Sequence, residues 1–482
     1  MSLFSRREVL SGLSAGALGL LALNKGGSAA LAGMGHVSAG NLSELTARKN
    51  RTSLHYLFCA KPKGLEGWPY HQYDHAARAE YFTRRLMQIG DIDWSGGEII
   101  EREEDIQGLK GKLDGADGLV VIALTSPARG LSSLYEMQLE TPTILFNDLF
   151  CGDCSFLGYQ QRAMGKGLRL VSLSSEDTGL LERKLQLLRA TARLRRSKII
   201  CFRERGDQNP DFTRTAAEKL GVELIYMGSA EINAAYEKAD KARAKEIAGR
   251  WIEAAEKVVE PKTEEIVDSA RMYLALSSLM QQEQANAVTV DCLTMVYGKK
   301  ISAYPCLAFV QMNDEGYVGA CESDLAATLT MLVVGYLADR PGFMSDPVLD
   351  TEAGLIYHAH CLSATRMSGL EGPAEPCVIR SHSEDRSGVS LEVKFTPGHK
   401  ITAAKYVPFD KMLVSTGEIV GNKSTELACR SKMVTRVDKE GVRRMLNGYS
   451  GGLHRIIFYG DHVEDLEDLG RLLDFQVVNE TA

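Results

Sequence analysis

Acidic side chains on either side of a short apolar segment are the residues in this sequence best suited to chemistry. Glu322 and Asp324 precede the segment, and Asp346 follows it. The large apolar residues between them are Leu325, Leu329, Leu332, Val333 and Leu337. Their helical spacing predicts a buried helix, which Pro341 ends. Buried carboxylates are costly unless a cation or hydrogen bonds compensate them, so these acids predict a divalent metal held by oxygen ligands.

The same acids allow a purely structural interpretation. Ser323 or Asp324 could cap the N-terminus of the helix, and Asp346 could be an ordinary aspartate of a turn. A histidine near the C-terminus favours the metal, because His454 stands directly before an apolar strand in GGLHRIIFYGDH. Imidazole and carboxylate groups together are common ligands of divalent metals.

At these residues the chain resembles a known family. The stretch from Ala320 to Pro347, ACESDLAATLTMLVVGYLADRPGFMSDP, together with LHRIIFYGDH, is similar to the L-fucose isomerase-like family. The resemblance covers roughly residues 141–482. It implies a divalent metal, usually Mn²⁺, bound by Glu322, Asp346 and His454. It also implies a homo-oligomer, either a trimer or a hexamer, with sites near subunit boundaries.

The chemistry that the resemblance implies is aldose–ketose isomerisation of a monosaccharide through an enediol. Glu322 and Asp346 would then be catalytic proton carriers, and the metal would stabilise the developing oxyanion. Two alternatives remain open, because fold does not determine function. One is an exported, metal-assisted glycosidase or lyase, and the other is a carbohydrate-binding protein without catalysis on the same fold.

Four further residues are predicted to contact the substrate. Trp68 lies in a loop of aromatic and polar residues, as sugar sites often require, and Asn147 follows an apolar strand. Asp314 lies on the approach to the acidic centre and is expected to support the ligands. His360 shares a strand face with His358 and could line the site. For each of these residues, a structural role is the alternative.

Short apolar runs alternate with helical segments along the sequence. This pattern predicts an α/β protein with two doubly wound, Rossmann-like domains and a smaller β-rich, barrel-like C-terminal domain, which together must position these residues. The expected bounds are 50–171, 172–345 and 346–482. Strands are predicted at 54–60, 118–124, 142–146, 198–202, 223–227, 287–291, 355–360, 378–383, 389–395, 400–407 and 411–420, and helices at 74–89, 182–195, 211–220, 231–259 and 263–284. The segment 231–259 is expected to be one exposed, charged helix.

The first residues read as an export signal. Ser5-Arg6-Arg7-Glu8-Val9-Leu10 matches the twin-arginine pattern, an apolar run follows, and 1–32 is the expected signal peptide. This predicts export by the twin-arginine machinery to a periplasmic or otherwise extracytoplasmic location, without stable membrane insertion after processing. The formal net charge of −7 and the lack of a basic stripe argue against nucleic acid as a partner.

The ten cysteines are scattered, and most stand in apolar runs. Buried thiols behave as small hydrophobic groups, which is the expected state of most of them. Cys151 and Cys154 are the one close pair, and they could form a disulfide or half of a zinc site.

Overall fold

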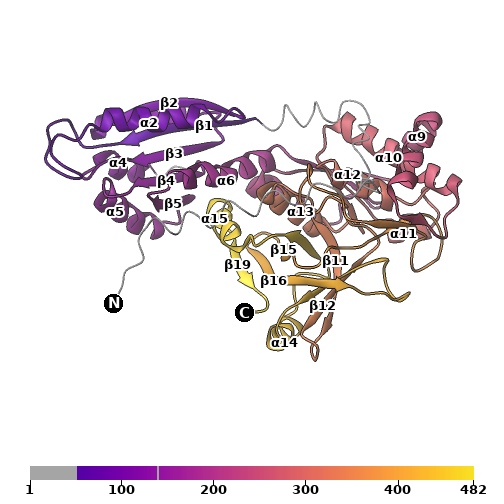
Figure 1. The fold of residues 1–482 in the computed structure, drawn as a ribbon. Helices are drawn as coiled ribbons and strands as arrows, with labels where there is room; N and C mark the ends of the chain where they lie inside the picture. The colour runs from indigo at the N-terminus through magenta and orange to yellow at the C-terminus, as the bar shows by residue number, and fades with distance from the viewer. Residues whose placement is uncertain (1–50, 138–139) are drawn as a thin grey trace, which may run out of the picture.

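The computed structural model describes residues 51–137 and 140–482. Within them, two parallel α/β sheets are followed by an antiparallel barrel (Figure 1). The predicted twin-arginine signal lies outside the described residues. No helix among the described residues has both the length and the apolar character needed to cross a membrane.

The first sheet is wholly parallel and has the strand order β2-β1-β3-β4-β5. Its strands are β1 (Thr52–Cys59), β2 (Ile92–Ile100), β3 (Gly118–Ala123), β4 (Thr143–Asp148) and β5 (Leu170–Ser175). The accompanying helices are α2 (His75–Met87), the 3₁₀ turn η1 (Glu103–Ile106), α3 (Leu109–Lys112), α4 (Arg129–Met137), α5 (Asp153–Met164) and α6 (Gly179–Arg195). Asp74 caps α2, as predicted, because its side chain accepts from the Ala77 amide at 3.0 Å.

The second sheet is also parallel, in the order β10-β9-β6-β7. Its strands are β6 (Lys198–Phe202), β7 (Glu223–Met227), β9 (Ala287–Val290) and β10 (Val318–Cys321). The helices are α7 (Pro210–Thr215) with a π-helical turn η2 (Ala216–Leu220), α8 (Ser229–Lys238), α9 (Lys241–Ala254), α10 (Thr263–Glu283), α11 (Cys292–Tyr297), α12 (Cys306–Asp314) and α13 (Leu325–Ala338).

The prediction of one exposed helix over 231–259 is wrong. Helix α8 ends at Lys238. Asp240 then caps a second helix, α9, because its side chain accepts hydrogen bonds from the Ala242 and Arg243 amides. The α9 helix has a buried face that includes Ile247 and Trp251, which packs against α10. Dense surface charge hid this face in the sequence.

The barrel has six antiparallel strands in the order β15-β18-β11-β12-β17-β16, and the pairing of β15 with β16 closes it. They are β11 (Phe343–Asp350), β12 (Leu355–His360), β15 (Lys400–Val407), β16 (Lys411–Asn422), β17 (Ser431–Arg436) and β18 (Arg455–Tyr459). β19 (Gln476–Asn479) adds to β16, while β8 (Lys257–Val258), β13 (Cys377–Arg380) and β14 (Ser390–Val393) form a small separate sheet. Helices α14 (Lys439–Asn447) and α15 (Val463–Leu473) complete this part.

Helix α13 joins the second sheet to the barrel. It is buried along almost its whole length, as its apolar pattern predicts, and it packs against α6, β15 and β18. The acidic turn before α13 and the strand β11 after it are therefore held where the second sheet meets the barrel. Figure 1 shows the first sheet standing apart from this junction.

We expect the pair formed by Arg455 and Glu480 to stabilise the barrel beside His454. Arg455 is fully buried, and its Nε and Nη2 donate to the Glu480 carboxylate at 2.8 and 2.6 Å. Glu480→Gln leaves a buried guanidinium without its counter-charge, so it should destabilise the fold by about 3 kcal/mol. The exposed Arg443–Glu352 pair provides the control, because Glu352→Gln should cost less than about 1 kcal/mol. Thermal unfolding followed by circular dichroism measures both, and equal effects would contradict this prediction.

Candidate metal centre

A strained turn between β10 and α13 carries Glu322. Both Glu322 and Ser323 have positive φ angles, +62° and +51°, which are uncommon for residues other than glycine. The neighbouring strands hold this turn in place. The Ser323 amide donates to the Val290 carbonyl at 3.1 Å, its hydroxyl donates to the Phe202 carbonyl at 3.1 Å, and Arg203 donates to the Ser323 carbonyl at 2.8 Å. Such strain persists where surrounding contacts impose it, and here it aims the Glu322 carboxylate at the barrel.

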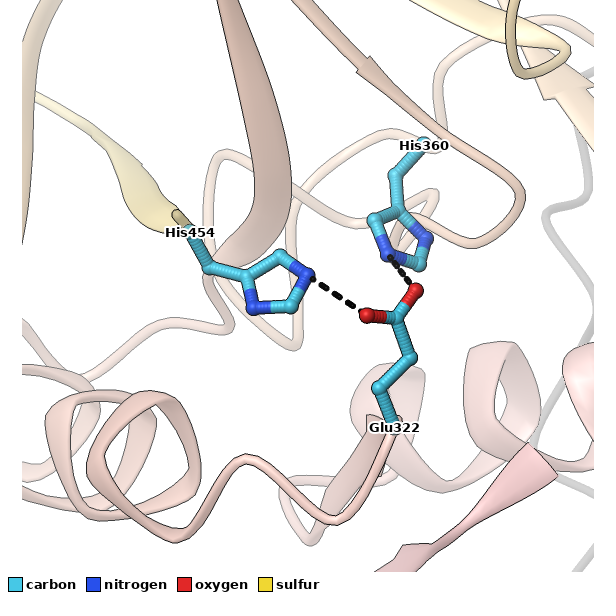
Figure 2. A group of neighbouring side chains, drawn as sticks. All are labelled: Glu322, His360 and His454. Atoms are coloured by element: carbon cyan, nitrogen blue, oxygen red, sulfur yellow. Dashed lines mark ion pairs between the residues drawn. The ribbon is translucent and has the colours of Figure 1, made fainter. Parts of the chain in front are cut away.

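Two histidines from the barrel face that carboxylate (Figure 2). His454 stands directly before β18, and its Nε2 lies 3.4 Å from Glu322 Oε2. His360 is the last residue of β12, and its Nε2 lies 3.8 Å from Glu322 Oε1. Asp346, from β11, places Oδ1 3.4 Å from His454 Nε2. Ligand atoms of Glu322, His360 and His454 all lie within 4.8 Å of one another.

These side chains have polar atoms that make no hydrogen bond within the described residues. His360 and His454 are 2% and 3% exposed. Within the described residues, Asp346 Oδ1, both ring nitrogens of His360 and Nε2 of His454 are buried without a hydrogen-bond partner. Orphaned buried polar atoms are rare in native proteins and call for an unseen partner. Two imidazoles and two carboxylates suit Mn²⁺, Mg²⁺ or Zn²⁺, so the residues fit a divalent metal.

Asp324 orients His454 from behind. Its Oδ2 lies 2.8 Å from His454 Nδ1 and also accepts from the buried Lys405 Nζ at 2.8 Å. Its Oδ1 accepts from the Ala327 amide at 2.8 Å and so caps α13. The predicted capping role of Asp324 is therefore confirmed, and the same carboxylate also holds an imidazole of the candidate metal centre. A carboxylate on the far nitrogen fixes the imidazole tautomer and leaves Nε2 facing the cluster.

The electrostatics of the cluster favour a cation. The adjacent His454 imidazole lowers the pKa of Glu322, whereas burial raises the pKa of Asp346. Burial opposes the charged form of His454, but its hydrogen bond to Asp324 and its ion pair with Glu322 outweigh burial and raise the pKa of His454 to about 9. Burial likewise opposes ionisation of Asp324, yet His454 and Lys405 hold its pKa well below the usual range. The negative charge of the surrounding carboxylates favours either a proton or a metal ion at His454 Nε2, so the two compete for this position.

The structure brings together some of the predicted site residues and separates others. Of the predicted ligands, Glu322 and His454 belong to the group that could hold a metal ion, with His360 as its third member, and Asp346 lies beside His454. Register explains why: Asp346 pairs with Ala359 across β11 and β12, so His360 follows at the same end of the ladder. His358 lies inside the barrel, where burial lowers its pKa to about 3 and Thr435 Oγ1 lies 2.9 Å from its Nε2.

The other candidates lie elsewhere in the chain. Asn147 is the last but one residue of β4 in the first sheet and donates to Asp153 and Ser174 at 2.9 Å. Trp68, which is 50% exposed, lies in a loop at the same sheet edge. Asp314 is buried and accepts from the Thr365 and Arg366 amides, which fastens a barrel loop to α12. Cys151 and Cys154 are free thiols.

A cavity opens from the metal ligands toward α11 and α12. It is lined by Glu322, Asp346 and His360 together with Cys292, Leu293, Val296, Tyr297, Tyr304, Pro305, Cys306, Cys321, Cys361, His382, Glu384 and Cys429. Tyrosine hydroxyls, carboxylates and imidazoles therefore converge on one space next to the cluster. Such a mixture of apolar walls and a few polar groups is typical of a small-molecule site.

Comparison with known proteins points to one class of enzyme. No family model matches the chain. The sulfoquinovose isomerase of Priestia aryabhattai is 25% identical over 311 residues, which cover 61% of this chain and 67% of that protein, and the Priestia megaterium sulfoquinovose isomerase matches equally. The Clostridium sp. sulfoquinovose isomerase is 24% identical over 42% of this chain and 46% of its own length. The chain is therefore distantly homologous to sugar isomerases, and its relatives in that class are sulfoquinovose isomerases.

The narrower assignment to the L-fucose isomerase-like family stays a prediction. Among solved structures, the XylFII molecule matches 56% of this chain and 96% of its own, with a TM-score of 0.13 and 11% identity. These values are too low to indicate a shared fold.

We expect Asp324→Asn to weaken metal binding by about 10- to 100-fold, because the asparagine loses the charge that orients His454. Asparagine caps helices as well as aspartate does, so α13 should keep its N-terminus. The control is Asp339→Asn at the exposed C-terminal end of the same helix, which should bind like the wild type. Calorimetric titration with Mn²⁺ measures the difference, and Glu322→Gln gives the reference for loss of a ligand. Unchanged affinity in Asp324→Asn would contradict the positioning role.

Proposed function

We propose that this protein is a metal-dependent aldose–ketose isomerase that acts on a monosaccharide through an enediol. The observation that supports this most is the set of buried, unpartnered ligand atoms on Asp346, His360 and His454, facing Glu322 beside a polar cavity. The distant homology to sulfoquinovose isomerases supports the reaction type. Mn²⁺ is the ion we propose, bound by Glu322, Asp346 and His454, with His360 as a further ligand.

The chain's own residues supply the proton carriers. A divalent ion, when bound, would polarise the sugar carbonyl and neutralise the oxyanion that develops on it. Glu322 and Asp346 come from different elements and both line the cavity, so an open-chain sugar can lie between them. One carboxylate takes the proton from C2 and returns it to C1, while the other moves the O2 proton to O1. Protons therefore balance over the reaction, and the aldose becomes the ketose.

The cavity lining indicates a neutral sugar. No lysine or arginine is among the described residues that line it, whereas Glu384 adds a carboxylate to those of Glu322 and Asp346. His382 also lines the cavity, but its imidazole already contacts Asp385, so a sulfonate would lie near these carboxylates with no lysine or arginine of the lining to pair with it. We therefore propose an uncharged aldose as the substrate, in contrast to the sulfonated sugar named for the relatives.

We expect the Mn²⁺-loaded protein to convert a neutral aldose into its ketose, and to exchange the C2 hydrogen with solvent. Proton NMR in D₂O follows both, across a panel of neutral aldoses with sulfoquinovose alongside. Glu322→Gln should lower turnover by at least about 100-fold, because it removes a proton carrier and a ligand. The exposed Glu352→Gln should retain wild-type turnover.

Each other outcome points to a different function. Cleavage of an intact glycoside, which has no free carbonyl, would indicate the glycosidase or lyase alternative. Tight sugar binding with neither turnover nor exchange would indicate a carbohydrate-binding protein. Turnover of sulfoquinovose in preference to every neutral aldose would contradict the proposed substrate class.

Two further proposals concern the whole chain. We propose export by the twin-arginine machinery, on the basis of Ser5-Arg6-Arg7, and a homo-oligomer, either a trimer or a hexamer. Exposed Trp68, Tyr70 and Phe150 lie in loops of the first α/β unit and offer aromatic surface for contact with a second copy. For the oligomer, multi-angle light scattering should give a mass of three or six chains. For export, the precursor of the double variant Arg6→Lys with Arg7→Lys should remain in the cytoplasm. A monomer, or export of the double variant, would contradict the respective proposal.

A further inference from the structure

The cavity beside the metal ligands contains thiols that the proposed isomerisation does not use. They are Cys292, Cys306, Cys321, Cys361 and Cys429. Half of the ten cysteines of the chain therefore line a single small space. Two of these residues are placed so that they can react with each other.

Cys292 and Cys321 lie at the carboxyl ends of neighbouring parallel strands. Cys321 is the last residue of β10, and Cys292 follows β9 as the first residue of α11. Their Sγ atoms are 2.6 Å apart, and a disulfide bond is about 2.05 Å long. A movement of roughly 0.5 Å would therefore join them. Cys321 is buried, whereas Cys292 is half-buried and offers a route for a reagent from solvent.

This thiol pair adjoins the strained part of the metal centre. Cys321 directly precedes Glu322 and Ser323, the residues with positive φ. While both thiols are free, hydrogen bonds such as the one from the Ser323 amide to Val290 hold the start of this turn. A covalent bond from Cys321 to Cys292 would fasten the start of the turn to the next strand connection. The Glu322 carboxylate would then have less freedom to leave the ligand position.

We propose that Cys292 and Cys321 form a reversible disulfide, and that the oxidised protein binds a divalent metal ion more tightly than the reduced protein. This regulation acts on the proposed metal centre and rests on the metal dependence proposed above. It does not depend on which sugar, if any, is isomerised.

The oxidant is a small-molecule disulfide such as oxidised glutathione. The Cys292 thiolate attacks one sulfur of that disulfide, the S–S bond breaks, and one glutathione thiolate leaves. The Cys321 thiolate then attacks the Cys292 sulfur of the mixed disulfide and releases the second glutathione thiolate. The two cysteine protons end on the two released thiols, so one disulfide is reduced as one is formed. Excess dithiol reverses both steps.

The test compares full-length protein equilibrated with oxidised glutathione and with dithiothreitol. After alkylation and digestion, mass spectrometry should find the Cys292 and Cys321 peptides joined only in the oxidised sample, and lighter by two hydrogen atoms. Mn²⁺ titration should give a dissociation constant lower by about 5-fold or more after oxidation. Because the bond closes a loop between residues 29 apart in sequence, the metal-free protein should unfold about 5 °C higher when oxidised.

Cysteine variants separate this pair from the other thiols. Cys292→Ser should unfold like the reduced wild type in both conditions and should lose the redox dependence of Mn²⁺ binding. Cys154→Ser, at an exposed thiol outside the cavity, should keep that dependence. Alkylation of both Cys292 and Cys321 after oxidation would overturn the proposal, and so would a bridge that leaves Mn²⁺ affinity unchanged. Failure of every aldose to react, with a redox-dependent Mn²⁺ affinity, would overturn only the isomerase function.

Discussion

The hydrogen bond between Asp324 and His454 is the contact on which the candidate metal centre depends. It joins residues 130 positions apart and connects the second sheet to the barrel. The same carboxylate caps α13 and accepts from Lys405 of β15. One side chain therefore contacts the helix, a barrel strand and the imidazole. Because Nδ1 is engaged by Asp324, Nε2 of His454 is the nitrogen left to face Glu322 and Asp346. Removal of this one charge would loosen His454 and leave the buried Lys405 without its partner, while an asparagine at this position would still cap α13.

The remaining ligands depend on backbone geometry rather than on side-chain support. Glu322 reaches the cluster because the turn after β10 adopts two positive φ angles, which Val290, Phe202 and Arg203 impose through hydrogen bonds to Ser323. Asp346 and His360 are set by the register of β11 on β12. The barrel therefore holds Asp346 and His360 through its strand register, whereas the second sheet holds Glu322 through a strained turn. A change that adjusts metal affinity would act most directly on the strained turn that carries Glu322.

The fold class could be predicted from the sequence because its strands have strong local signals. The run Gly118–Ala123 is apolar throughout, as expected for a parallel strand covered on both faces. Ile92–Ile100 was not recognised, since its central Ser95-Gly96-Gly97 breaks the apolar pattern of an edge strand. For the site, Glu322, Asp346 and His454 followed from the family resemblance. The ligand position of His360 and the Asp324–His454 contact depend on strand register and long-range packing, which no local pattern shows.

The charges at the junction favour metal binding over a purely structural cluster. A structural cluster would be expected to satisfy its buried atoms internally, as Asp314 does with the Thr365 and Arg366 amides. Around Glu322 the described residues instead leave buried polar atoms without hydrogen-bond partners: Asp346 Oδ1, His454 Nε2 and both nitrogens of His360. The buried Lys405 donates to Asp324. The counter-charge that faces Glu322 and Asp346 is the titratable imidazole of His454, and a divalent cation from solution can take the place of its proton.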